Sequence, residues 1–285
     1  MYQQAENKWL FTSSQLKTER QNLAAKYPAV TLDEQMHFIH FFASKIPDYC
    51  SVLQLSLQIK LTALALFHRI YTQKTIFEIE TKHAVIISLF LAAKIETPTS
   101  NTDLAVFLSK IPKSPTITEF IILESQIANV LCYDFQITHP LIPLYGFFID
   151  LKPTLEDAQS FYTLHYLPCV GLVTECYVQA RNMEYTASQL AFCLLYSSAP
   201  EIMEGYIRSK LAIQDGVVSI GQIEYLLELA VSFEKVKYIK TPDKSVLSGI
   251  AAKIKNVVVI KIEEPPRMTD FPHENQPKEF NDPFN

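Results

Sequence analysis

The chain has 285 residues, of which 48% are hydrophobic and 19% are charged, and its formal net charge is −5 at pH 7. This length predicts about two domains, and the apolar fraction is ample for buried cores. Only 6 glycines are present, which argues against phosphate-cradling loops and tightly turned α/β folds because such loops need glycine. The acidic balance excludes a strong overall attraction to DNA or RNA, although a local basic patch stays possible.

The sequence contains no dinucleotide-binding, P-loop, zinc-protease, EF-hand or zinc-knuckle motif. We therefore predict no cofactor, no metal and no catalytic activity of the chain itself, and the start of the chain lacks a signal-peptide pattern. The cysteines form no CxxC pair, and their apolar neighbours predict reduced core residues of an intracellular protein. They are Cys50, Cys132, Cys169, Cys176 and Cys193.

The first elements in chain order are two capped helices. Thr12 or Ser13 with Gln15 indicates a helix cap, and Pro28 closes this peripheral N-terminal helix. A second cap at Thr31 predicts a helix to about Ile46, where Pro47 ends it. On that second helix two histidines, His37 and His40, lie three positions apart, but no further metal ligand is evident, so we interpret both as partly exposed helix residues.

The central stretch Leu61–Thr97 predicts two helices. From Ala84 to Ala93 the only polar residue is Ser88, so this segment must be surrounded by protein on every side, and it is too short to span a membrane. Charge appears at its exit, where Lys94 complements the helix dipole. After Pro98 the sequence predicts a short helix capped by Asn101 or Thr102 and a longer one from about Thr116, which makes five helices from Thr31 to Phe135.

Glu124 is the most unusual charge in the chain. Phe120, Ile121, Ile127 and Ala128 flank it at helical spacing, which places a carboxylate within an apolar stripe. From the residues alone, an internal ion pair, for example with Lys94, is the favoured interpretation of this position.

A proline-marked break at His139–Pro140 separates a second helical half, whose helix pattern implies an internal structural repeat. Pro168 should kink or divide the second helix of that half. We predict helices at Pro143–Leu151, Glu156–Gln179, Thr186–Ala199, Glu201–Ile213 and Val217–Ile239. A last helix follows Pro242, Val257–Ile262 favours an extended segment, and the tail after Glu263 is predicted to be disordered.

The stretch Phe67-His68-Arg69-Ile70-Tyr71, with Leu91-Ala92-Ala93-Lys94-Ile95-Glu96, resembles the cyclin box. Three further strings are similar to the H-type cyclins: Trp9-x-Phe11-Thr12-Ser13-Ser14, Gly146–Lys152, and Tyr185–Ala191 running on to Ser197–Ala199. The resemblance implies an all-α fold of two tandem five-helix cyclin-box repeats with additional N-terminal and C-terminal helices. The implied domains are 1–30 (N-terminal helix), 31–138 and 139–240 (repeats), 241–262 (C-terminal helix and extended segment) and 263–285 (tail).

The same resemblance implies a function and a site. It assigns Lys94 and Glu124 to a kinase-binding surface, and Arg69, Tyr71 and Ala92 to structural positions of the cyclin box. The chain would be a non-catalytic regulatory subunit that activates a cyclin-dependent kinase catalytic subunit. The implied assembly is a nuclear CDK-activating kinase with a RING-finger subunit, linked to the TFIIH core and to RNA polymerase II tail phosphorylation, without direct contact to nucleic acid or membrane.

Two alternatives stay open. Another transcription cyclin, such as a Mediator-type cyclin C, would share the fold and surface but bind a different kinase. A TFIIB-like DNA-binding protein also has two such repeats, but it usually carries a zinc ribbon and basic helices that this sequence lacks. The substrate-docking string of cell-cycle cyclins has no counterpart here, which favours a transcription-type cyclin.

Overall fold

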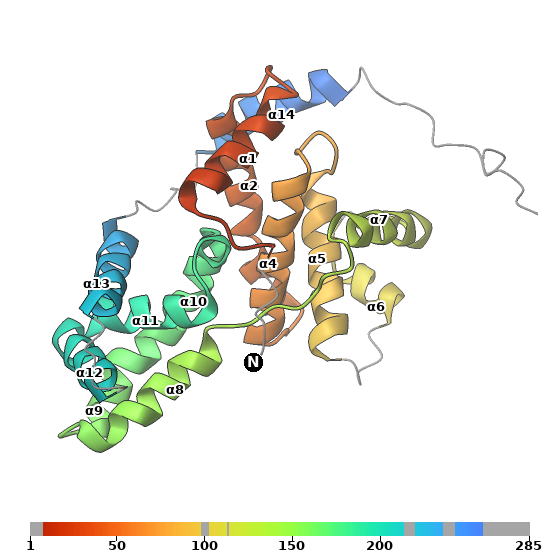
Figure 1. The fold of residues 1–285 in the computed structure, drawn as a ribbon. Coiled ribbons are helices and arrows are strands. Elements are labelled where there is room, and N and C mark those ends of the chain that lie inside the picture. The colour runs from red at the N-terminus through yellow and green to blue at the C-terminus, as the bar shows by residue number, and fades with distance from the viewer. Residues whose placement is uncertain (1–7, 98–102, 113, 214–219, 236–242, 259–285) are drawn as a thin grey trace, which may run out of the picture.

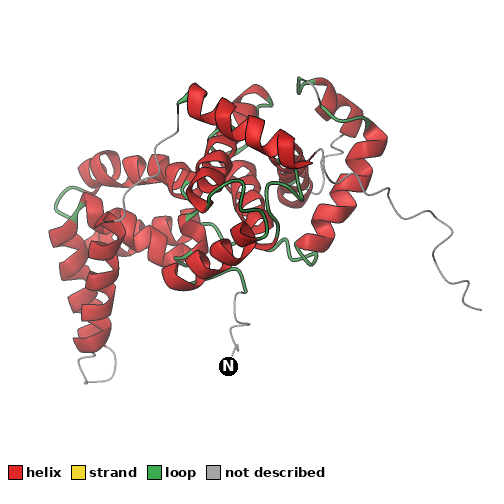
Figure 2. Ribbon diagram, turned by 90° about the horizontal axis from the view of Figure 1, so that it is seen from above, coloured by secondary structure: helices red, strands yellow, loops and turns green. Residues whose placement is uncertain are grey.

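The computed structural model describes residues 8–97, 103–112, 114–213, 220–235 and 243–258. All regular structure in these ranges is helical (Figure 2), as predicted, and none of the helices there is long and apolar enough to cross a membrane. The α-helices are α1 (Ser13–Ala25), α2 (Leu32–Ala43), α3 (Ile46–Val52), α4 (Leu57–Gln73), α5 (Thr81–Glu96), α6 (Leu104–Ser109), α7 (Ile117–Val130), α8 (Leu141–Leu151), α9 (Ala158–Phe161), α10 (Leu167–Val178), α11 (Ala187–Ser198), α12 (Pro200–Ile213), α13 (Ile220–Lys235) and α14 (Lys244–Val258).

Helices α4 and α5 pack side by side at the centre of the first repeat, with α1, α2, α3 and α7 around them (Figure 1). Eleven of the sixteen residues of α5 are buried, because the segment has no polar face to turn towards water. Thirteen of the seventeen residues of α4 are buried as well. The predicted central helix with protein on every side is therefore confirmed.

Ser88 in the middle of α5 is fully buried, and its hydroxyl has no hydrogen-bond partner. Replacing it with alanine removes an unsatisfied polar group, so Ser88→Ala should leave the free energy of unfolding unchanged or raise it by about 1 kcal/mol. Urea unfolding measures this change. Thr72→Val is the control, because the buried Thr72 hydroxyl donates to the Arg69 carbonyl at 2.7 Å and its loss should cost about 1 kcal/mol. A clear loss of stability in Ser88→Ala would contradict the expectation.

The predicted helix starts are largely correct. The hydroxyl oxygens of Thr12, Thr31, Thr116 and Thr186 each accept from the amide three residues on. The backbone amide of each threonine donates in return to the side chain of that third residue, which completes a capping box. The cap of α6 is Asp103, not Asn101 or Thr102, which lie outside the described residues.

Two prolines account for places where a predicted helix is followed by, or divided into, a further helix. Pro47 does not simply end α2: it lies in the first turn of an additional short helix, α3, where its missing amide hydrogen costs nothing. The described residues between Thr31 and Phe135 thus form six helices instead of the five that were predicted. Pro168 interrupts the second helix of the second half, as predicted. It lies in the first turn of α10, directly after a π-helical turn at Tyr162–Tyr166.

Two side chains differ from their predicted environments. His40 is buried, and burial lowers its pKa, since α2 turns this side chain towards the second repeat near Val178. Cys132 is exposed and has a positive φ of 52°, because it lies in the turn that ends α7. The other four cysteines are buried, as predicted.

Helices α8 to α13 form the second repeat, in which α11 is the buried central helix. The linker from α7 to α8 crosses α4 and α5 (Figure 1). Helix α14 returns to the first repeat, where Lys253 Nζ lies 2.6 Å from Glu34 Oε1 of α2. It includes Val257 and Val258, so the predicted extended segment is wrong there. Residues 259–262 and the predicted disordered tail lie outside the described residues, and the domain boundaries stay predictions.

Candidate functional site

The last turn of α5 and the middle of α7 meet in an ion pair. Lys94 Nζ lies 2.7 Å from Glu124 Oε1, and the ammonium is 4.9 Å from the centroid of the Phe90 ring. The Lys94 side chain is 51% exposed and the Glu124 side chain 19% exposed. The structure thus brings together the two residues assigned to the kinase-binding surface, and it leaves the lysine open to a further partner.

Aromatic packing beneath the pair sets its geometry. Phe90 lies one turn before Lys94 on α5, and its ring meets Phe120 of α7 edge to face at 5.1 Å. Phe120 in turn lies one turn before Glu124. Phe90 also contacts Phe107 of α6 at 5.2 Å, so one buried ring holds three helices and fixes where both charges emerge.

Exposed apolar residues lie beside Glu124 on α7. Ile117, Ile121 and Glu124 share one face of this helix at helical spacing, and Ile117 and Ile121 are 48% and 54% exposed. Val106 of α6 is also exposed. Large apolar residues grouped around a few charges are typical of a protein-binding surface. We refer to Lys94, Glu124, Ile117 and Ile121 together as the α5–α7 surface.

Arg69 joins α4 to the linker. Its guanidinium donates to the carbonyl oxygens of Asp134 and Gln136, both at 2.9 Å. Trp9 covers it at 5.1 Å, and the Trp9 indole donates to the Asp134 carboxylate at 2.9 Å. Burial lowers the pKa of Arg69 to about 10, and Asp134 opposes that shift, so the guanidinium stays charged at neutral pH. These contacts are internal, because the Arg69 side chain is only 6% exposed.

Tyr71 and Ala92 are also internal. The Tyr71 hydroxyl donates to the Ile79 carbonyl at 3.1 Å, its ring packs against Phe67 at 5.1 Å, and burial raises its pKa. Ala92 is fully buried in α5, in the helix that packs against α4. A larger side chain at Ala92 would separate the two central helices.

A second polar group near the site was missed by the sequence interpretation. The buried Thr62 hydroxyl donates to Glu96 Oε1, and His139 Nε2 lies 2.9 Å from Thr62 Oγ1 and 3.3 Å from Glu96 Oε1. One signal could have indicated it: an anion at the C-terminal end of a helix opposes the helix dipole and needs a compensating partner. Its partners could not be predicted because they are 34 and 43 residues away along the chain.

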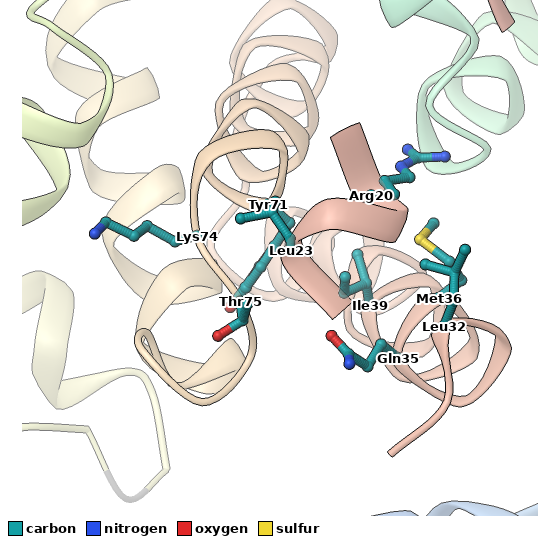
Figure 3. A pocket seen from close by; sticks show the side chains of 9 residues that line it. All are labelled: Arg20, Leu23, Leu32, Gln35, Met36, Ile39, Tyr71, Lys74 and Thr75. Atoms are coloured by element: carbon teal, nitrogen blue, oxygen red, sulfur yellow. The ribbon is translucent and has the colours of Figure 1, made fainter. Parts of the chain in front are cut away.

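A pocket lies on the opposite side of the first repeat, between α1, α2 and α4 (Figure 3). It offers room for about one water molecule, beside the buried Thr75 hydroxyl, which has no partner. It is too small to enclose a substrate. Within the described ranges, no three His, Cys, Asp or Glu side chains are grouped so that they could hold a metal ion.

Two tandem helical repeats around the buried helices α5 and α11, with a Lys–Glu pair at the exit of α5, define a cyclin-type fold. Residues 10–136 match the family described as cyclin, N-terminal domain. This part of the chain therefore forms a cyclin N-terminal domain.

Among curated proteins, the chain is similar to cyclin CCL1 of Saccharomyces cerevisiae, with 25% identity over 68% of this chain and 49% of the relative. It is 25% identical to cyclin mcs2 of Schizosaccharomyces pombe over 72% of this chain and 64% of the relative. It is 26% identical to a putative cyclin-H of Dictyostelium discoideum over 50% of this chain and 54% of the relative. The chain thus spans about half to two thirds of the length of these relatives. They identify it as similar to cyclin H.

Solved structures show the same fold. A chain of the CAK complex of Chaetomium thermophilum bound to ATP-gamma-S matches with a TM-score of 0.73 and 17% identity, over 87% of this chain and 85% of that one. A chain of the yeast TFIIK (Kin28/Ccl1/Tfb3) complex matches with a TM-score of 0.68 and 22% identity, over 79% of this chain and 95% of that one. At these identities the likeness concerns the fold alone.

Proposed function

We propose that this chain is a regulatory cyclin subunit that binds and activates a cyclin-dependent kinase catalytic subunit. One observation carries the proposal: in the domain that matches the cyclin family, Lys94 and Glu124 lie paired beside the exposed isoleucines of the same α7 face. A pair that only stabilised the fold would not need the exposed apolar side chains around it, since a surface ion pair contributes little by itself.

The α5–α7 surface has the groups needed to hold a kinase helix. Lys94 can donate to carbonyl oxygens at a helix end, and Glu124 can accept from amide hydrogens, while the isoleucines exclude water from both. Docking would hold the mobile helix of the kinase inward, so that its glutamate pairs with the catalytic lysine, and would help to order the activation loop. This chain would contribute no catalytic group.

The finer assignment is to a CDK-activating kinase. It is supported by the H-type relatives and by the neighbours from CAK and TFIIK complexes, one of which has three named components. In this assembly the chain would also contact a RING-finger subunit and the TFIIH core. The complex would be nuclear and would phosphorylate other cyclin-dependent kinases and the RNA polymerase II tail.

Purification of the tagged chain from its own cells tests both the binding of a cyclin-dependent kinase and the assignment to a CDK-activating kinase. We expect a cyclin-dependent kinase and a RING-finger protein in about equal amounts, kinase activity on an RNA polymerase II tail peptide, and no activity of the chain alone. Recovery of Mediator subunits without TFIIH subunits would contradict the assignment to a CDK-activating kinase and would indicate a cyclin of the C type instead. Absence of any kinase, with tight binding of the isolated chain to promoter DNA, would overturn the proposal in favour of a TFIIB-like protein.

A further inference from the structure

Glu96 is the last residue of α5 and lies two positions beyond Lys94. Two positions correspond to about 200° around a helix, so the two side chains leave α5 on opposite sides. Lys94 meets Glu124 on the outside, whereas Glu96 turns inward to Thr62 of α4 and His139 of the linker. The last turn of α5 is therefore held from both sides.

The hydrogens of this inner group can be assigned from its geometry. A carboxylate only accepts, so the Thr62 hydroxyl hydrogen goes to Glu96, and Thr62 Oγ1 then accepts from the Nε2–H of His139 at 2.9 Å. The His139 side chain is only 10% exposed, and its Nδ1 has no partner. Burial lowers the pKa of His139 despite the neighbouring carboxylate of Glu96, which favours the neutral ring that this assignment requires.

The partners of Glu96 are themselves fixed. Thr62 lies inside α4 and is fully buried. The linker that carries His139 is bound to the same helix by Arg69, about two turns further along α4, and Thr138 accepts from the Tyr177 hydroxyl at 3.4 Å. Glu96 thus connects the end of α5 to a rigid support.

The end of α5 needs such a support. The last four carbonyl groups of a helix have no partner within the helix, and a negative charge at that end is unfavourable for the helix dipole. Without its partners, Glu96 would weaken the turn that carries Lys94. With them it stabilises that turn.

We propose that Glu96 is a positioning residue for the kinase-binding surface. Together with Thr62 and His139 it holds the last turn of α5 in the register in which Lys94 meets Glu124. This inference rests on the proposed function for its consequence in kinase binding, but its structural part can be tested without a kinase.

Hydrogen exchange on the isolated chain tests the structural part. In the Glu96→Ala variant the backbone amides at positions 95, 96 and 97 should exchange about tenfold faster or more. Amides in the first turns of α5 should exchange at an unchanged rate. Glu96→Gln keeps an oxygen that can accept from Thr62 and should restore most of the protection. The control is Glu78→Ala, which removes a similarly half-buried carboxylate from the turn between α4 and α5. Unchanged exchange at residues 95–97, or equal acceleration along all of α5, would overturn the inference.

A double-mutant cycle tests the consequence, with the kinase subunit that co-purifies with the tagged chain as the probe. Glu96→Ala should lower the affinity about tenfold, but it should add no more than about twofold when Lys94→Ala is already present, because it acts through Lys94. The same loss in both backgrounds would reject the positioning role and leave the proposed function intact. If Lys94→Ala alone leaves the affinity unchanged, the proposed site is wrong, and the exchange result still decides whether Glu96 holds the turn.

Discussion

The double variant Lys94→Ala with Glu124→Ala is expected to bind the kinase about 100-fold more weakly while keeping its fold. Charged residues within a water-excluding apolar rim account for much of the binding energy of such interfaces. Removing both partners leaves no unpaired charge, and an exposed pair contributes only about 0.2–1 kcal/mol to folding. Calorimetric titration with the kinase subunit measures the affinity, and thermal unfolding measures the stability.

Two further variants separate docking from internal pairing. Exchange of the two charges, Lys94→Glu with Glu124→Lys, preserves the internal ion pair but reverses what the surface presents, so kinase binding should be lost as in the double alanine variant. The matched control is Asp150→Ala with Lys210→Ala, which removes an ion pair between α8 and α12. In this pair Lys210 Nζ lies 2.8 Å from Asp150 Oδ1, and the Lys210 side chain is 50% exposed, much like that of Lys94. Its kinase affinity should not change. Normal binding by the exchanged variant would show that the pair is only structural.

Arg69→Leu is expected to lower the free energy of unfolding by about 3–5 kcal/mol. The substitution leaves the carbonyl groups of Asp134 and Gln136 without their donor and removes the cation beneath Trp9. Arg69→Lys should recover only a small part of the lost free energy of unfolding, because one ammonium cannot reach two carbonyl groups in the fork geometry of a guanidinium. Urea unfolding followed by the fluorescence of Trp9, the single tryptophan of the chain, reports this junction directly.

The control for Arg69 is Arg208→Ala. Arg208 lies on α12, is 58% exposed and pairs only within one helix turn with Glu204, so its loss should cost less than about 0.5 kcal/mol. A comparable small effect at Arg69 would mean that the linker is held by other contacts.

Local signals in the sequence predicted local structure well. Thr12 and Thr31 were identifiable as caps because a capping box involves residues only three apart. Pro168 was identifiable as a helix divider because its ring removes a backbone donor. The same kind of signal misled at Pro47, since proline favours the first turn of a helix as much as it ends one, and α3 was missed.

The candidate site was predicted in part. The apolar stripe around Glu124 and the charged exit of α5 indicated two unusual charges, and resemblance to the cyclin box assigned them to one surface. The group of Glu96, Thr62 and His139 was not predicted, because an anion at the end of α5 indicates only that a partner is needed, and the partners are distant along the chain. Likewise nothing near His40 along the chain indicates its burial against the second repeat.

The sequence by itself determined that the chain is all-helical and has two halves, and that α5 must be a central helix, because helical periodicity, caps and burial of an apolar segment depend on neighbouring residues. Only the tertiary structure decided which distant groups meet: Lys94 with Glu124, Arg69 with the linker carbonyls, and Glu96 with His139. The physical reason is that hydrogen bonds and ion pairs act over about 3 Å in space, whereas their partners lie 30 to 67 residues apart along the chain.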